Sequence, residues 1–301
     1  TGYFAMREFS TGFDGNGLPR FLLNGIPVFA SGVLYEGYWP DGLATPPCDE
    51  ALAADLENAK AFGFNTIRLR DKVECARFYY HCDRLGLMVW QGMPTGGRDS
   101  VPRLPAKDHQ YAFFGRKEPE SRRQHMRELR EMVTQLRSCP CVVLWELFDR
   151  GRGQFDTENL CRFVNELDGT RPIDPVSGGV SQAGQVKTLQ PGGRHVGFAP
   201  DGSGRAIAFS LFGGYSNAVE GHLFAPAAGE KTLCDSPQRL HFTIESAYED
   251  IIRPAMDSGL AGCIFCQLTD VEGDITGLLT YDRQLLKLPP QQLRSIFSLT
   301  L

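Results

Sequence analysis

The sequence predicts an α/β fold in which eight parallel strands close into a (β/α)8 TIM barrel, preceded by a short N-terminal β-hairpin. Strand-like apolar runs alternate along the chain with segments of helical length, as in repeated strand-helix units. The chain has 301 residues, enough for one barrel of about 250 residues and its excursions. We therefore expect residues 1–30 to form the hairpin segment and residues 31–301 to form one barrel domain.

The N-terminal elements follow from turn signals and periodicity. Short apolar runs and Gly-rich turns over residues 1–30 indicate a hairpin. This hairpin is either a lid on the bottom of the barrel or the seam to an upstream domain. The first barrel strand is expected over residues 28–35, and the first helix over residues 49–62, with Asp49 as a candidate cap.

The same pattern then repeats to the end of the chain. Further strands are expected at residues 65–69, 87–91, 173–177, 186–189, 206–211 and 262–268, and one begins at Val142. Helices are expected at residues 74–85, 119–136 and 155–167, near 238–256 and near 290–297. Residues 98–117 carry mixed charge and are expected to form a long loop on the active face. Eight strands separated in this way favour a closed barrel over an open sheet.

Composition bounds the class of protein. Hydrophobic residues make up 42% and charged residues 22%, which is typical of a globular domain. No apolar window is long enough to cross a bilayer, and the net charge of -5 does not favour nucleic acid as a partner. The nine cysteines are odd in number and lie mostly in apolar runs, so we expect free thiols and a reducing intracellular or organellar compartment.

Motifs for metals, cofactors and targeting are weak. Cys263 and Cys266 have a redox-like spacing, but a strand would place them on opposite faces, which suits neither a shared metal nor a disulfide. The histidines lack metal-ligand spacing, and the Gly-rich pieces lack the strand-to-helix context of a phosphate loop. We expect no metal or cofactor. No targeting signal follows Thr1.

Several long motifs occur in an order that resembles a known enzyme family. They are Asn24-Gly25-Ile26-Pro27-Val28, Gly37-Tyr38-Trp39-Pro40-Asp41-Gly42, the run from Arg77 to Gly86, Gly151 with Gly153-Gln154-Phe155-Asp156-Thr157, Phe212-Gly213-Gly214, and Thr269-Asp270-Val271-Glu272-Gly273. Together they resemble the catalytic barrel of glycoside hydrolase family 2, which includes β-galactosidases, β-glucuronidases and β-mannosidases. The resemblance implies the barrel fold and a possible upstream β-sandwich domain.

The resemblance also implies where catalysis would occur. Retaining glycosidases need two carboxylates about 5 Å apart, one as acid/base and one as nucleophile. The family's acid/base Glu aligns with Arg150, and its nucleophile, the Glu before Phe-Gly-Gly, aligns with Leu211. An arginine does not donate a proton at neutral pH, and a leucine cannot attack a sugar. We therefore expect the retaining mechanism to be absent.

Other residues near the strand ends are expected to form the rim of the former substrate pocket. These are Tyr35, Glu36, Trp39, Arg68, Asp71, Trp90, Asp149, Arg152, Gln267 and Asp270. Asp71 beside Arg70, and Asp149 beside Arg150 and Arg152, are expected to form ion pairs that fill the pocket. Glu146 shares strand parity with Arg150 and would need a partner inside the barrel.

Two alternatives for these side chains stay open. Glu36, Asp71, Asp149, Asp270 and Glu272 could supply an unorthodox catalytic pair. The tryptophans at positions 39, 90 and 145 could stack on sugars, although core packing is favoured.

The leading functional hypothesis is a catalytically degenerate family 2-like barrel that serves as a structural or interaction module, with other protein subunits of a larger assembly as partners. A carbohydrate-binding module that keeps the pocket is a second hypothesis. An active β-glycosidase with relocated carboxylates is a third.

Overall fold

A single parallel sheet organises the molecule. The computed structural model describes residues 3–96, 116–191, 198–225 and 233–301. Eight strands pair in the order β8-β7-β6-β5-β4-β11-β10-β9. Their bounds are β4 Ala30–Tyr35, β5 Thr66–Leu69, β6 Met88–Gly92, β7 Val142–Glu146, β8 Ile173–Asp174, β9 Val186–Leu189, β10 Ala206–Gly213 and β11 Leu260–Cys266. The predicted α/β barrel of eight parallel strands is confirmed.

The barrel closes between β8 and β9 through side chains, since these neighbouring strands share no backbone ladder. The Thr188 hydroxyl donates to Asp174 Oδ2 at 2.6 Å and accepts from the Gly178 N–H at 3.0 Å. The Ile173 N–H donates to Gln185 Oε1 at 3.0 Å. These bonds satisfy polar groups that an open seam would leave unpaired.

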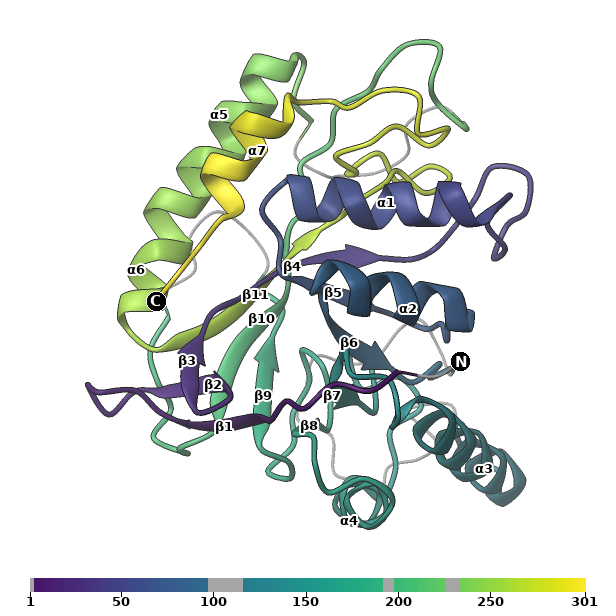
Figure 1. Cartoon of the computed structure of the whole chain (residues 1–301), viewed down its shortest axis with the longest axis vertical. Coiled ribbons are helices and arrows are strands. Elements are labelled where there is room, and N and C mark those ends of the chain that lie inside the picture. The colour runs from purple at the N-terminus through teal and green to yellow at the C-terminus, as the bar shows by residue number, and fades with distance from the viewer. Residues whose placement is uncertain (1–2, 97–115, 192–197, 226–232) are drawn as a thin grey trace.

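Helices surround the sheet (Figure 1). They are α1 Asp49–Ala61, α2 Ala76–Leu85, α3 Pro119–Leu136, α4 Thr157–Leu167, α5 Pro237–Ala247, α6 Arg253–Asp257 and α7 Pro290–Phe297. In Figure 1, α5, α6 and α7 lie together on one side of the sheet, and α1 and α2 on the other. Their apolar faces and the outward-facing strand residues form the larger of the two core clusters.

Three elements differ from the prediction. The helix expected near residues 238–256 is interrupted by the π-helical turn η1, Tyr248–Ile252, before Pro254, whose ring nitrogen has no hydrogen to donate to an upstream carbonyl. The strand expected over residues 173–177 stops at Asp174, because Pro175 cannot donate to a ladder. The strand expected over residues 28–35 divides at Phe29 into β3 and β4.

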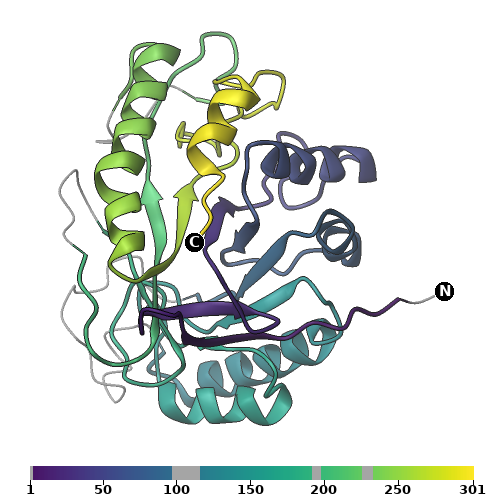
Figure 2. The ribbon, with the colours of Figure 1, turned by 60° about the vertical axis from the view of Figure 1, so that its left-hand side comes forward.

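The N-terminal segment forms a three-stranded antiparallel sheet rather than a hairpin alone. Its strands are β1 Phe9–Phe13, β2 Pro19–Leu23 and β3 Ile26–Val28, and Figure 2 shows them crossing one end of the barrel. The Phe21 ring lies 5.4 Å from Phe9 and 5.5 Å from Trp90, within the cluster that fills the barrel interior. Arg20 donates to the carbonyls of Leu260 and Met256 at 2.7 and 2.9 Å. The segment therefore covers the amino-terminal end of the barrel, as a lid does.

The remaining sequence predictions on cysteines and loops have simple outcomes. Cys263 belongs to the outer core cluster and Cys266 to the interior cluster, so the two lie on opposite faces of β11 as predicted. All nine cysteines lie in described segments, and none of them forms a disulfide bond. Most of the expected loop at residues 98–117 lies outside the described residues. Within the described part of the chain, no helix has both the length and the apolar character required to cross a membrane.

Removing the Phe21 ring tests the role of the lid. Phe21→Ala should lower the free energy of unfolding by about 3–5 kcal/mol, because it opens a cavity at the fully buried contact with Phe9 and Trp90. The matched control is Phe13→Ala in the same sheet, where the ring is 61% exposed, with an expected change within about 0.5 kcal/mol. Urea denaturation measures both. Equal effects would contradict the lid assignment.

Candidate functional site at the carboxyl ends of the strands

The polar centre of the barrel is Arg68, which is fully buried on β5. Its Nε donates to Glu146 Oε2 at 2.8 Å, and its Nη2 donates to Glu146 Oε1 at 2.5 Å. The same Nη2 donates to Asp149 Oδ1 at 2.9 Å. Glu146 therefore has the partner inside the barrel that its strand parity required, and the pair has the fork geometry typical of strong Arg-carboxylate contacts.

Arg68 also reaches across the barrel to the opposite strands. Its Nη2 donates to Ser177 Oγ at 3.0 Å, and its Nη1 donates to the carbonyl of Ser210 on β10 at 3.1 Å. Burial lowers the pKa of Arg68, but the carboxylates of Glu146 and Asp149 outweigh burial and raise it. The guanidinium therefore stays charged and ties together strands that are far apart in sequence.

A second layer of ion pairs lies above Arg68. Arg152 donates to Asp149 Oδ2 at 2.9 Å and also to Asp71. Arg70 pairs with Glu36. The predicted pairing of Asp149 with Arg152 is thus present, whereas Asp71 takes Arg152 instead of its neighbour Arg70. Asp71 pairs with the more distant arginine because its backbone has a left-handed φ of 55°, and its carboxylate faces the loop that carries Arg152.

Arg150 does not pair with Asp149, contrary to the expectation from sequence. The Arg150 side chain is exposed, and its Nε donates to Gln190 Oε1 at 2.6 Å. Gln190 in turn donates to Asp149 Oδ1 at 3.2 Å. Arg150 also has a φ of 53°, a left-handed conformation that is costly for a residue with a Cβ.

Leu211 faces the barrel interior because β10 is irregular. Phe209 and Phe212 both belong to the outer core cluster, and the pairing register of β10 with β11 shifts between them. Ser210 and Leu211 are the two residues between these outward-facing rings. Leu211 packs against the interior cluster, whereas the Ser210 carbonyl binds Arg68.

The loop after β11 holds a separate buried pair. Lys287 Nζ donates to Asp270 Oδ1 at 2.7 Å, and the Gly277 N–H donates to the same oxygen at 2.7 Å. Burial raises the pKa of Asp270 to about 6, although Lys287 opposes the rise. Gln267 is buried at the start of this loop. Lys287 was not among the residues predicted from the sequence, where a lone cation within the apolar run of residues 285–288 is its signal.

Three of the predicted rim residues are buried side chains. Tyr35 stacks on Phe78 at 5.5 Å in the outer core, and Trp90 packs against the lid through Phe21. Trp39 is buried beneath the Arg283 guanidinium, which lies 3.8 Å from its ring centre. Trp39 and Trp90 were candidates for stacking on sugars because aromatic faces suit sugar rings, and here both rings pack inside the protein instead.

The remaining tryptophan is also part of the core. Trp145 is buried and donates to Asp168 Oδ2 at 2.9 Å. All three tryptophans thus agree with the packing interpretation that the sequence favoured.

Asp174 is a buried carboxyl in the barrel interior with a strongly raised pKa. Burial, followed by the nearby charge of Glu146, raises the pKa of Asp174 to about 8. Glu146 is held by two guanidinium hydrogen bonds, whereas Asp174 accepts a hydrogen bond from the Thr188 hydroxyl. We assign the ionised form to Glu146 and the proton to Asp174 at neutral pH.

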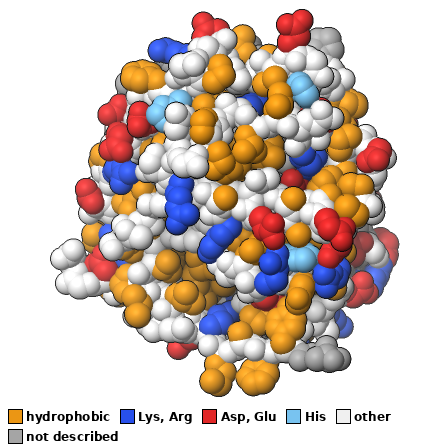
Figure 3. Space-filling view, turned by 45° about the horizontal axis from the view of Figure 1, so that its top comes forward, with side chains coloured by type: hydrophobic (Ala, Val, Ile, Leu, Met, Phe, Trp, Pro, Cys, Tyr) orange, Lys and Arg blue, Asp and Glu red, His pale blue; other side chains and the backbone are white. Residues whose placement is uncertain are grey.

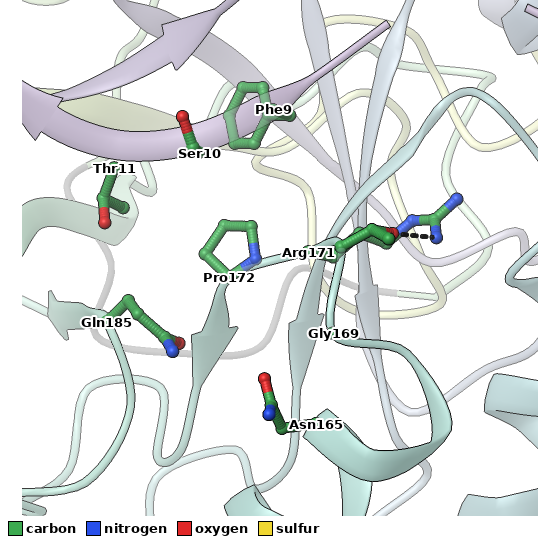
Figure 4. Close-up of a pocket in the computed structure, with 9 residues that line it drawn as sticks. Phe9, Ser10, Thr11, Asn165, Gly169, Arg171, Pro172 and Gln185 are labelled. Carbon is green, nitrogen blue, oxygen red and sulfur yellow. Dashed lines mark hydrogen bonds between the residues drawn. The ribbon is translucent and has the colours of Figure 1, made fainter. Parts of the chain in front are cut away.

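The described residues at the lid end of the barrel line a small cavity, and the described part of the chain holds no metal site. Among the residues described, no cluster of His, Cys, Asp and Glu side chains could hold a metal ion. A cavity of about 180 Å³ lies at the lid end, between β1, the end of α4 and the loop before β8 (Figure 4). Arg171 beside it binds Val142, Asp168 and neighbouring carbonyls. The guanidinium of Arg171 therefore stabilises the fold and is not available to bind a ligand in the cavity.

The Asp174 proton makes stability depend on pH. The unfolded carboxyl ionises near pH 3.8 and the folded one near pH 8, so the folded state binds the proton more tightly, and stability falls as pH rises through this window. In the unmodified chain the free energy of unfolding should fall by roughly 3 kcal/mol between pH 5 and pH 8 through this group, and Asp174→Asn should abolish that fall. The control Asp257→Asn alters an exposed carboxyl and should keep the original profile. Parallel profiles for Asp174→Asn and the unmodified chain would contradict the assignment.

The left-handed backbone at residue 150 gives a second expectation. Arg150→Gly should raise the free energy of unfolding by about 0.5–1 kcal/mol, because glycine adopts a φ of 53° without a Cβ clash. Arg152→Gly should lower it, since Arg152 lacks that conformation and pairs with both Asp71 and Asp149. Thermal unfolding of the two variants tests the contrast. A loss of stability in Arg150→Gly would show that the contact with Gln190 outweighs the strain.

Similar sequences support the identity of the barrel. A β-galactosidase of Vibrio cholerae is 24% identical over 163 residues, which cover 54% of this chain and 15% of that protein. A β-galactosidase of Yersinia pestis is 26% identical over 162 residues, covering 53% of this chain and 14% of that protein. The chain thus spans about one seventh of the length of these curated relatives.

Solved structures share the fold over nearly the whole chain. A family 2 β-galacturonidase from Eisenbergiella tayi superposes with a TM-score of 0.72 at 16% identity, covering 98% of this chain and 55% of that one. A β-glucuronidase from an uncultured Clostridium species gives a TM-score of 0.72 at 19% identity, covering 98% and 54%. At this identity the likeness concerns the fold.

Residues 20–190, more than half of the chain, match the sequence profile described as glycosyl hydrolases family 2, TIM barrel domain. The chain belongs to glycosyl hydrolase family 2 and matches the TIM-barrel domain of that family.

Proposed function

We propose that this barrel has lost the hydrolytic mechanism of its family and serves as a structural or interaction module within a larger protein or assembly. The observation that carries the proposal is the pair of residues at the aligned catalytic positions, Arg150 and Leu211. Leu211 packs against the interior cluster, and Arg150 hydrogen-bonds to Gln190 on the surface. Neither side chain can protonate a glycosidic oxygen or attack an anomeric carbon at neutral pH.

The ion pairs at the mouth support the same proposal. Retaining hydrolysis requires a protonated acid and a free carboxylate on either side of a sugar ring. The five other candidate carboxylates at the strand ends all have partners: Glu36 with Arg70, Asp71 and Asp149 with Arg152, Asp270 with Lys287, and Glu272 with the Tyr38 hydroxyl at 2.8 Å. Each of these contacts binds at least one oxygen of its carboxylate and holds that side chain in place.

The surface is consistent with a protein partner rather than a nucleic acid. Acidic and basic side chains are interspersed over the face shown in Figure 3, with apolar side chains between them. The net charge of the chain is -5. Binding to a phosphate backbone depends on concentrated positive charge, whereas protein interfaces tolerate mixed surfaces. Other protein subunits, or other domains of the same protein, are therefore the proposed partners.

A glycosidase assay tests the loss of catalysis. We expect turnover of aryl β-galactosides, β-glucuronides and β-mannosides to stay at the buffer rate, because no paired acid and nucleophile flank the mouth. An active β-glucuronidase assayed at the same concentration serves as the positive control. Measurable turnover that falls in Asp149→Asn or Asp71→Asn would overturn the proposal and favour relocated carboxylates.

Calorimetric titration with a panel of glycans separates the structural module from a carbohydrate-binding one. We expect no heat of binding, since Arg152 bridges Asp71 and Asp149 across the mouth. The matched variant Arg152→Ala breaks that bridge. Binding by the unmodified chain that is lost in Asp149→Ala would support the carbohydrate-binding alternative.

A further inference from the structure

Arg68 lies between the two positions that align with the family's catalytic residues. It donates to Asp149, the residue before Arg150, and to the carbonyl of Ser210, the residue before Leu211. These contacts come from opposite sides of the barrel, since Asp149 follows β7 and Ser210 lies in β10. Arg68 therefore contacts the residue that precedes each of the two positions.

A guanidinium that is fully buried requires a carboxylate in contact with it. Desolvation makes an unpaired buried charge cost several kcal/mol, so a single loss of a partner is poorly tolerated. Residue 211 is placed inside the barrel by the irregularity of β10, next to the carbonyl that Arg68 binds. A leucine at that place supplies no charge.

Glu146 supplies the charge from another strand. It is 1% exposed, lies in β7 and holds Arg68 by two hydrogen bonds of 2.8 and 2.5 Å. The other partner, Asp149, is shared with Arg152. Glu146 is thus the carboxylate that serves Arg68 without a second cation in contact.

We infer that Glu146 replaces a carboxylate at position 211 as the counter-charge of Arg68. This barrel would then differ from a hydrolytic one at three linked positions, 146, 150 and 211, rather than at 150 and 211 alone. The inference rests on the proposed function for the meaning of position 211. Its physical content is that residues 146 and 211 are interchangeable sources of one buried negative charge. Only one of the two can be a carboxylate without leaving an excess buried charge.

A double-mutant cycle tests this interchange. The variants are Glu146→Gln, Leu211→Glu and the two together, with the urea midpoint of unfolding as the readout. Each single change should lower the midpoint, the first by removing a carboxylate from Arg68 and the second by adding a surplus one to the interior. The double variant should recover about half or more of the loss seen in Glu146→Gln, because the new carboxylate replaces the old one.

The matched control is Leu211→Gln, which has the size and polarity of the glutamate but no charge. It should not rescue Glu146→Gln. If Glu146→Gln alone fails to fold, folding of the double variant supports the inference, and failure of both overturns it. Additive losses, or equal rescue by Leu211→Gln, also overturn it.

The outcome is independent of catalysis. Turnover by the unmodified chain would refute the proposed function, whereas the cycle reports only whether the two positions share one charge. Glu146→Asp keeps the charge on a shorter side chain and should lower the midpoint less than Glu146→Gln.

Discussion

The contact between Arg68 and Glu146 is the interaction on which the barrel interior depends. A guanidinium on β5 and a carboxylate on β7 are both removed from water, and their attraction is useful only because each also meets further hydrogen-bonding groups. Through Asp149, Ser177 and Ser210, one side chain links both halves of the sheet. An apolar residue at position 68 would leave Glu146 uncompensated, which explains why the charges occur together.

The two ends of the barrel solve different physical problems. At the amino-terminal end, the lid buries Phe9 and Phe21 on the interior cluster, so this end is held by apolar packing and by the Arg20 contacts. At the carboxyl end, charged side chains form ion pairs, with Arg68 bound to Glu146 and Asp149 and with Arg152 bound to Asp71 and Asp149. Strands β8 and β9 share no backbone ladder, and the hydroxyl of Thr188 on β9 instead donates a hydrogen bond to Asp174 on β8.

Membership of the family and the proposed loss of its chemistry are compatible because fold and function depend on different residues. The shared motifs supply turns, strands and helix faces, whereas hydrolysis requires two carboxylates at a fixed separation. In this chain the first set forms a complete barrel. The proposed loss of hydrolysis therefore involves side chains at the mouth and in the interior, and leaves the packing between strands and helices intact.

The sequence by itself determined the eight strands, the ring of helices and the burial of the tryptophans, because periodicity and residue size act locally. It also indicated that Glu146 needed an interior partner. Only the tertiary structure identified that partner as Arg68, assigned Arg152 to Asp71, and brought Lys287 to Asp270. Ion pairs join residues far apart in the chain, and their choice depends on strand register, on the irregularity of β10 and on loop direction. No local pattern encodes those three properties.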